Sequence, residues 1–325
     1  MSQRFEERPP VAFGGMMVAL SVLLAAGTKI FPILIGFFAA IPLALAGLHL
    51  STRDSLVSAA AATLLVGLFF GPFFGLAFLF QYAILGVFTG LAVKKQWTFK
   101  HLFLVAWVIQ CIGMLVFLGI QFAIAGFDLT ATLKPYLNME NEMIAIAKEM
   151  HLFERMQTTK MDAYTIETLF RQSMQFFMKI LPAAYAGLTA VMVAVHLFLF
   201  RVVCKRLRLG NGLATPAYDQ VIMPVTLLIP LIGCWIILLA KEIFPSEILW
   251  LVALNGMVIC IGGMGIGGLS LILHNIRWRA LAMPFKMVYA LIFFLMGQYL
   301  FIVAAFIGIF DTILDFRHLR TQTKE

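Results

Sequence analysis

Long apolar runs with few charged side chains constrain the fold of this chain more than any other feature of its sequence. A helix needs about 20 mainly apolar residues to cross the hydrocarbon layer of a bilayer. Nine segments approach this length, and residues 11–27 and 55–70 are the shortest of them. The others are 30–50, 73–93, 102–126, 176–200, 221–243, 246–273 and 282–312.

These runs predict an all-α integral membrane helix bundle that crosses the bilayer eight or nine times. Of the 325 residues, 62% are hydrophobic and 12% are charged, whereas soluble domains contain about 25% charged residues. Lipid offers no hydrogen bonds to the backbone, so each spanning segment must pair its own N–H and C=O groups. The runs lack the strict alternation of barrel strands, so helices are expected.

Basic residues predict the orientation of the chain. With the N-terminus in the cytoplasm of a bacterium, the short outer loops hold only Lys29 and Lys241. The inner segments then hold thirteen, which are Arg4, Arg8, Arg53, Lys94, Lys95, Lys100, Arg201, Lys205, Arg206, Arg208, Arg277, Arg279 and Lys286. This asymmetry follows the positive-inside rule for an inner membrane. The net charge of +8 therefore indicates contact with anionic lipid head groups, and nucleic acid is not an expected partner.

The C-terminal tail does not fit this map. It carries Arg317, Arg320 and Lys324, yet nine crossings would place it outside. Residues 282–312 are too few for two full crossings. Either one proposed span is re-entrant or interfacial, or the tail departs from the positive-inside rule.

The longest hydrophilic insertion, residues 127–175, is expected on the outer face. An apolar stripe at helical spacing predicts a helix that packs on the bundle or in the lipid interface. Its residues are Met139, Met143, Ile146, Met150 and Phe153. Glu167 stands four residues before Arg171, a spacing that favours a surface ion pair. The insertion is either a cover over helix ends or a lid over a binding cavity.

A basic, loop-like stretch at 201–220 separates six proposed spans from three. We therefore expect a membrane core at 1–200, which includes the outer insertion, and a C-terminal extension at 201–325.

Polar side chains within the predicted spans are costly in lipid and mark candidate sites. They are Gln81, Gln110, Gln121, His196, Asn255 and Gln298. Gln110 and Gln121 are eleven residues apart, which is about three helical turns, so they share a face. If Gln81 also points inward, these glutamines line a polar cavity. The alternative role for each residue is an interhelical hydrogen bond.

Other motifs favour packing over chemistry. Gly263, Gly265 and Gly268 match the spacing of a dinucleotide-binding loop, but they lie within an apolar run and favour close helix contact. Asp311, Asp315 and Arg317 predict an interfacial anchor at the end of the last helix, where Arg317 would reach Asp315 or lipid phosphates. No catalytic residue, metal ligand set or cofactor is predicted.

Two stretches resemble a known family. The first comprises Phe31-Pro32 through Pro42, Phe69-Phe70-Gly71-Pro72 and the pair Gly86/Gly90, and the second is the closing Gly-Ile-Phe-Asp-x-x-x-Asp-Phe-Arg. Together they resemble the YybS-like bacterial membrane proteins, a family of unknown function. The first six spans are similar to the substrate-binding S subunits of energy-coupling factor vitamin transporters.

This resemblance implies a six-helix bundle that binds a small solute and docks on a membrane coupling subunit and ATPases. Gly15 and Ala19 would form the docking surface on the first helix. The link Gly27-Thr28-Lys29 is shorter than the usual lid of those subunits, and three further spans follow. We expect a solute-binding or transport-associated membrane protein that is not an enzyme. The alternative is a non-transporting scaffold or regulator of other membrane machinery.

Overall fold

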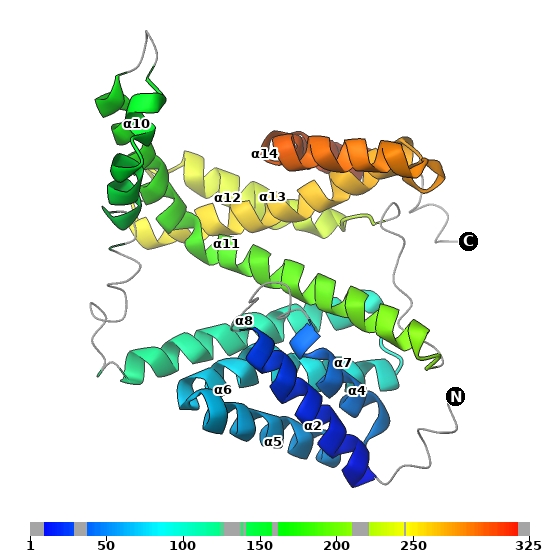
Figure 1. Cartoon of the computed structure of the whole chain (residues 1–325). Coiled ribbons are helices and arrows are strands. Elements are labelled where there is room, and N and C mark those ends of the chain that lie inside the picture. Colours follow the sequence, from blue (N-terminus) through cyan, green and yellow to red (C-terminus); the bar gives the residue numbers. More distant parts are fainter. Residues whose placement is uncertain are drawn as a thin grey trace. The chain divides into compact units, whose positions relative to one another are not determined.

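The computed structural model describes residues 10–28, 38–124, 126, 138, 141–157, 162–209, 221–243 and 245–317. Within these ranges every regular element is helical (Figure 1). The elements are α2 (Pro10–Gly27), α4 (Ile41–His49), α5 (Thr52–Phe70), α6 (Pro72–Phe78), the π-helix η1 (Leu79–Ala83), α7 (Ile84–Lys94), α8 (Phe99–Ile124), α10 (Leu152–Arg155), α11 (Ala163–Arg206), the 3-10 helix η3 (Val225–Leu227), α12 (Leu228–Leu239), α13 (Glu247–Asn275), the 3-10 helix η4 (Trp278–Ala280) and α14 (Met283–Leu314).

Several of these helices are long and apolar enough to cross a membrane. By length and composition five qualify, namely Thr52–Phe70, Pro72–Lys94, Phe99–Ile124, Ala163–Arg206 and Glu247–Asn275. Shorter apolar helices cover Val11–Gly27, Val225–Leu239, Met283–Phe293 and Tyr299–Leu314. The prediction of an all-α chain with helices long and apolar enough to span a membrane is thus confirmed for the described residues, and the total of eight or nine crossings stays a prediction.

The chain divides into two compact units. Unit 1 comprises 1–138 and 188–215, and unit 2 comprises 139–187 and 216–325. Helix α11 contributes its first part to unit 2 and its last part to unit 1. Residues 139–187 of the insertion therefore group with the C-terminal helices. The expected division into a core at 1–200 and an extension at 201–325 stays a prediction.

In unit 1, the closest helix contact joins α4 to α7. A Cβ atom on Gly90 would overlap the carbonyl oxygen of Ala44, and a Cβ on Gly47 would lie 2.6 Å from that of Val87. The core around this contact includes Leu43, Leu85 and Leu102, which are fully or almost fully buried. The pair Gly86/Gly90 thus serves packing within the protein, because only glycine lets two backbones approach so closely.

In unit 2, α13 and α14 make the corresponding contact. A Cβ on Gly268 would overlap the carbonyl oxygen of Ala304, and a Cβ on Gly308 would overlap that of Met264. The run with dinucleotide-loop spacing is helical throughout and lies inside α13. A phosphate-binding loop needs backbone N–H groups that are free of helical bonds, so this run cannot act as one.

The outer insertion forms a helical hairpin at the start of α11. Ile144 and Ala147, from helical residues 141–149, are buried with Phe153 of α10 beside Phe170 of α11. Lys148 and Arg171 both pair with Glu167, at 2.9 and 3.5 Å, so the expected Glu167–Arg171 pair is present.

The predicted apolar stripe is divided between two environments. Phe153 is buried, whereas Met143, Ile146 and Met150 are exposed. Met139 lies outside the described residues. The helix thus has a second apolar face, because Ile144 and Ala147 supply the buried contact that the stripe was expected to make.

Candidate functional site

A small polar cavity lies between helices of unit 1. Gln81 and Tyr82 of η1, Leu85 of α7, Gln110 of α8, and Met192 and His196 of α11 line it together with Ala40, which precedes α4. The space available to the centre of a water-sized sphere is about 10 Å³. This is room for about one water molecule.

The π-helix η1 places Gln81 and Tyr82 at this cavity. It interrupts an otherwise continuous apolar helix, Pro72–Lys94, and its wider turn shifts the faces on which side chains stand. Two glycines bring the neighbouring backbones close. A Cβ on Gly86 would overlap the carbonyl oxygen of Ala40, and one on Gly113 would lie 3.2 Å from that of Phe80. Single π-turns of this kind occur frequently at functional sites.

The two most deeply buried polar side chains of the cavity have atoms without a hydrogen-bond partner among the described residues. His196 is 2% exposed and Gln110 is 6% exposed. Neither ring nitrogen of His196 has a partner among the described residues, nor has Oε1 of Gln110. The imidazole stacks on Phe200, with ring centroids 6.4 Å apart. Because buried polar groups in proteins are usually paired, these atoms are available to hydrogen-bond a water molecule or another polar group in the cavity.

The structure brings Gln81, Gln110 and His196 together at one cavity, whereas the sequence analysis grouped Gln81 and Gln110 with Gln121. The other predicted residues lie elsewhere. Gln121 is half-buried on α8 and is not among the cavity residues. Asn255 belongs to unit 2. Gln298 lies in α14, but its side chain is outside the described part of the structure.

Asn255 joins α13 to α11 beside a proline. The N–H of Ala183 donates to Oδ1 of Asn255 at 2.8 Å, and Nδ2 of Asn255 donates to the carbonyl oxygen of Lys179 at 2.9 Å. In an uninterrupted helix these two backbone groups would bond each other. Pro182 lies inside α11 next to Ala183 and disrupts the helix there. The amide therefore bridges one broken step of the hydrogen-bond ladder, which is the alternative role that the sequence analysis left open.

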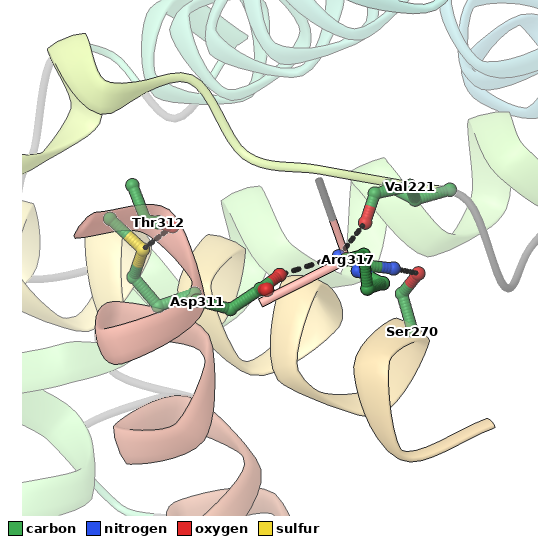
Figure 2. Close-up of polar contacts among 6 residues, drawn as sticks. Val221, Ser270, Asp311, Thr312 and Arg317 are labelled. Carbon is green, nitrogen blue, oxygen red and sulfur yellow. Dashed lines mark hydrogen bonds and ion pairs between the residues drawn. The ribbon is translucent and has the colours of Figure 1, made fainter. Parts of the chain in front are cut away.

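A second polar cluster lies in unit 2, where Arg317 contacts side chains and backbone of other segments (Figure 2). Arg317 Nη2 lies 2.6 Å from Oδ2 of Asp311 and 3.0 Å from the carbonyl oxygen of Val221, while Nη1 lies 2.7 Å from Oγ of Ser270. Asp315 ends α14 in the left-handed conformation, with φ 47°, and turns the chain back so that Arg317 faces α13. Arg317 and Asp311 are both buried.

The pattern of Asp311, Asp315 and Arg317 predicted that Arg317 reaches Asp315 or lipid phosphates. In the structure Arg317 instead contacts Asp311, Ser270 and Val221. The partners Ser270 and Val221 lie 47 and 96 residues away from Arg317 along the chain. No local spacing marks them. A basic residue directly after a long apolar helix was the available signal that some acceptor must lie nearby.

Gly15 and Ala19 lie on an outward face of α2. Both are exposed, and a Cβ on Gly15 would meet no atom within 4 Å. The neighbouring Gly14 packs inward, where a Cβ would lie 3.0 Å from Oγ of Ser58. The pair thus does not serve a contact between described helices of this chain.

A family model described as "Predicted membrane protein (DUF2232)" matches residues 16–312. The match covers the cavity residues and Asp311 and ends before Arg317. No curated protein and no solved structure matches the chain. Because the family model spans nearly the whole sequence, the chain belongs to the DUF2232 family of predicted membrane proteins.

Proposed function

We propose that this protein binds a small polar solute in the unit 1 cavity and takes part in its transport across the membrane. The observation that carries the proposal is the pairing of two buried, unsatisfied groups, the imidazole of His196 and the amide oxygen of Gln110, at one cavity. Polar groups within membrane-spanning helices mark solute and ion pathways. The role that we propose for this cavity is binding and not catalysis.

The chemistry of the guest follows from these groups. A neutral imidazole offers one N–H donor and one acceptor, and Oε1 of Gln110 is an acceptor. A guest that satisfies both residues must therefore carry hydrogen-bond donors and an acceptor, as amides and nitrogen heterocycles do. Since the cavity has room for about one water, a larger solute requires the helices around η1 to separate.

The finer architecture that we propose follows the family resemblance. We infer an S-subunit-like, YybS-like core of six spans within eight or nine crossings, in a bacterial inner membrane with the N-terminus in the cytoplasm. A membrane coupling subunit and ATPases would be the partners. The outward pair Gly15/Ala19 supports this proposal, because small residues on an exposed helix face let a partner helix approach closely.

A scaffold or regulator that transports nothing is the second candidate. It is favoured by a specific observation, the exposed apolar face of Met143, Ile146 and Met150 on the outer hairpin. Contiguous exposed apolar surface outside the bilayer marks interaction sites. Both candidates use the pair Gly15/Ala19, so that pair does not distinguish them.

A ligand screen tests the leading proposal. Purified protein in detergent is heated with vitamins, nucleobases and metal chelates, and the unfolding midpoint is recorded. The stabilising compound should lose its effect in Gln110→Leu and His196→Leu but keep it in Gln121→Leu, a matched change on α8 away from the cavity. If no compound raises the midpoint, and cells carrying Gln110→Leu and His196→Leu behave as wild type, the transport proposal is wrong.

Affinity purification from native membranes separates the two candidates. Recovery of a coupling subunit with ATPases supports transport. Recovery of other membrane machinery alone supports the scaffold.

A further inference from the structure

Two lysines of unit 2 converge on one tryptophan. Nζ of Lys179, on α11, lies 5.5 Å from the ring centroid of Trp250, and Nζ of Lys241, just after α12, lies 5.3 Å from the same centroid. Trp250 stands in the first turn of α13 and is half-buried, while both lysines are exposed. We propose that this Lys179–Lys241–Trp250 cluster binds the phosphate of an anionic membrane lipid.

The cluster is built from segments of unit 2 that contact one another. Asn255, five residues after Trp250 on α13, bonds the carbonyl oxygen of Lys179 itself. The backbone that carries one ammonium group is therefore fixed to the helix that carries the ring. Lys241 follows α12, which packs against α13. The three side chains thus come from three segments whose relative positions within unit 2 are set by packing.

The charge of the cluster calls for an anion. Two ammonium groups beside one ring repel each other, and the electron-rich face of the indole offsets only part of that repulsion. Glu242 and Glu247 lie between Lys241 and Trp250 in the sequence. Among the described residues, neither ammonium group forms an ion pair with these or any other carboxylate. A phosphate diester would supply the missing negative charge.

The surroundings favour a lipid over a free anion. Leu239, Ile243 and Ile248 are 74–77% exposed next to the cluster in the chain, so apolar surface for acyl tails adjoins the cations. The cluster also lies where one apolar helix, Val225–Leu239, ends and the next, Glu247–Asn275, begins. Chain positions of this kind meet the head-group region, where tryptophan is enriched.

Fluorescence quenching tests the proposal. Trp97, Trp107, Trp235 and Trp278 are replaced by Phe so that Trp250 alone reports, and the protein is placed in nanodiscs of phosphatidylcholine with a minor share of phosphatidylglycerol. Bromine on the acyl chains of one lipid at a time quenches a nearby indole. Brominated phosphatidylglycerol should quench Trp250 more strongly than an equal share of brominated phosphatidylcholine.

Charge variants give the decisive comparison. Each lysine should raise the apparent affinity for the anionic lipid about fivefold, so Lys179→Gln/Lys241→Gln should lose the preference and Lys179→Arg/Lys241→Arg should keep it. The control Lys205→Gln/Lys286→Gln removes the same charge elsewhere and should leave quenching unchanged. Equal quenching by the two lipids, or a preference that survives in Lys179→Gln/Lys241→Gln, overturns the proposal.

Two further measurements test lipid binding without the fluorescence variant and distinguish a lipid from free phosphate. Native mass spectrometry of the chain with all its tryptophans should show retained phosphatidylglycerol, which Lys179→Gln/Lys241→Gln releases, and this needs no fluorescence variant. Inorganic phosphate added to the nanodiscs should not reverse the quenching preference. If it does so at concentrations comparable to the lipid, the cluster binds free phosphate and the lipid assignment is wrong.

Discussion

Single side chains close gaps in the backbone of this protein that the helices themselves leave open. Asn255 bonds both the N–H of Ala183 and the carbonyl of Lys179, two groups beside Pro182. One amide thereby satisfies a donor and an acceptor that lipid cannot serve. The stability that Asn255 contributes depends on the break in α11, and not on its own helix α13.

Asn255→Leu should therefore destabilise the protein by about 2 kcal/mol, because each backbone group left unpaired costs about 1–3 kcal/mol and partial relaxation recovers some of it. Unfolding of the reconstituted protein in SDS measures the change. Asn275→Leu, at the exposed end of α13, is the matched control and should change little. Pro182→Ala in the Asn255→Leu background should restore stability, since the helix can then close its own bond. Equal losses with and without Pro182 would contradict this account.

Arg317 is the second residue on which a local structure depends. Arg317→Met leaves the buried carboxylate of Asp311 without its cation, so we expect a loss of about 3–5 kcal/mol in the free energy of unfolding. The double change Arg317→Met/Asp311→Leu should be less harmful than Arg317→Met alone, because no uncompensated charge remains. Lys286→Met provides a control for loss of a basic residue in α14. A double variant as unstable as the sum of both single variants would refute the pairing.

The sequence indicated which polar residues are candidates for a site. It did not indicate which residues these side chains contact. Gln81, Gln110 and His196 were chosen because polar groups in apolar runs are costly. The pairing of Arg317 with Ser270 was not visible, since it depends on the register between α13 and α14. The position of Asn255 opposite Pro182 depends on helix packing in the same way.

At the scale of the elements, two of the long helices were predicted well, whereas the run at 176–200 is only part of α11 (Ala163–Arg206). The runs at 102–126 and 246–273 are observed as α8 (Phe99–Ile124) and α13 (Glu247–Asn275). The π-helix inside the run at 73–93 had no sequence signal, because it depends on one extra residue being accommodated by neighbours. This missed feature places Gln81 and Tyr82 at the cavity.

The glycines between α13 and α14 set how closely these two helices pack. Gly268→Ala should destabilise the protein by about 1–3 kcal/mol, since the methyl group must push the carbonyl of Ala304 away. Gly262→Ala on the same helix meets no atom within 4 Å and should be neutral or stabilising by up to about 1 kcal/mol through helix propensity. SDS unfolding of both variants gives the comparison. Equal effects would mean that the close contact is not required.

The start of α11 should respond to acid. Hydrogen bonds from the side chain and backbone N–H of Thr165 lower the pKa of Asp162 below its ordinary value of 3.8. A lowered pKa means that the carboxylate stabilises this helix end fully above about pH 4. The stabilisation is lost as the pH falls through the folded-state pKa. Hydrogen exchange at 163–166 should therefore speed up in acid relative to the intrinsic rate, and Asp162→Asn should remove that response.

At the scale of the whole molecule, lipid explains the many apolar side chains on the outside. Leu64 and Leu68 of α5 are 72% and 78% exposed, which in water would be a large unfavourable surface. Composition alone predicted this environment. It did not predict the two units, because the grouping of 139–187 with 216–325 arises from contacts between distant segments.

Side-specific labelling tests the orientation. On a chain whose native cysteines are replaced by serine, Met150→Cys should react with an impermeant maleimide in intact cells. The Met150 side chain is exposed on the hairpin that we assign to the outer face. Arg53→Cys, at an exposed position in the first turn of α5, which we assign to the cytoplasmic side, should react only after lysis. The reverse pattern would invert the map, and equal labelling of both sites would refute it.

The shared helix α11 also sets the order in which the protein can be completed during synthesis. The chain makes most of unit 1 first, then builds the hairpin of unit 2, and only afterwards supplies residues 188–215 to unit 1. His196 thus leaves the ribosome after every other residue of the cavity. A nascent chain that has not yet delivered α11 holds Gln81 and Gln110 in an incomplete pocket, so the pocket cannot be finished before residues 139–187 have been synthesised.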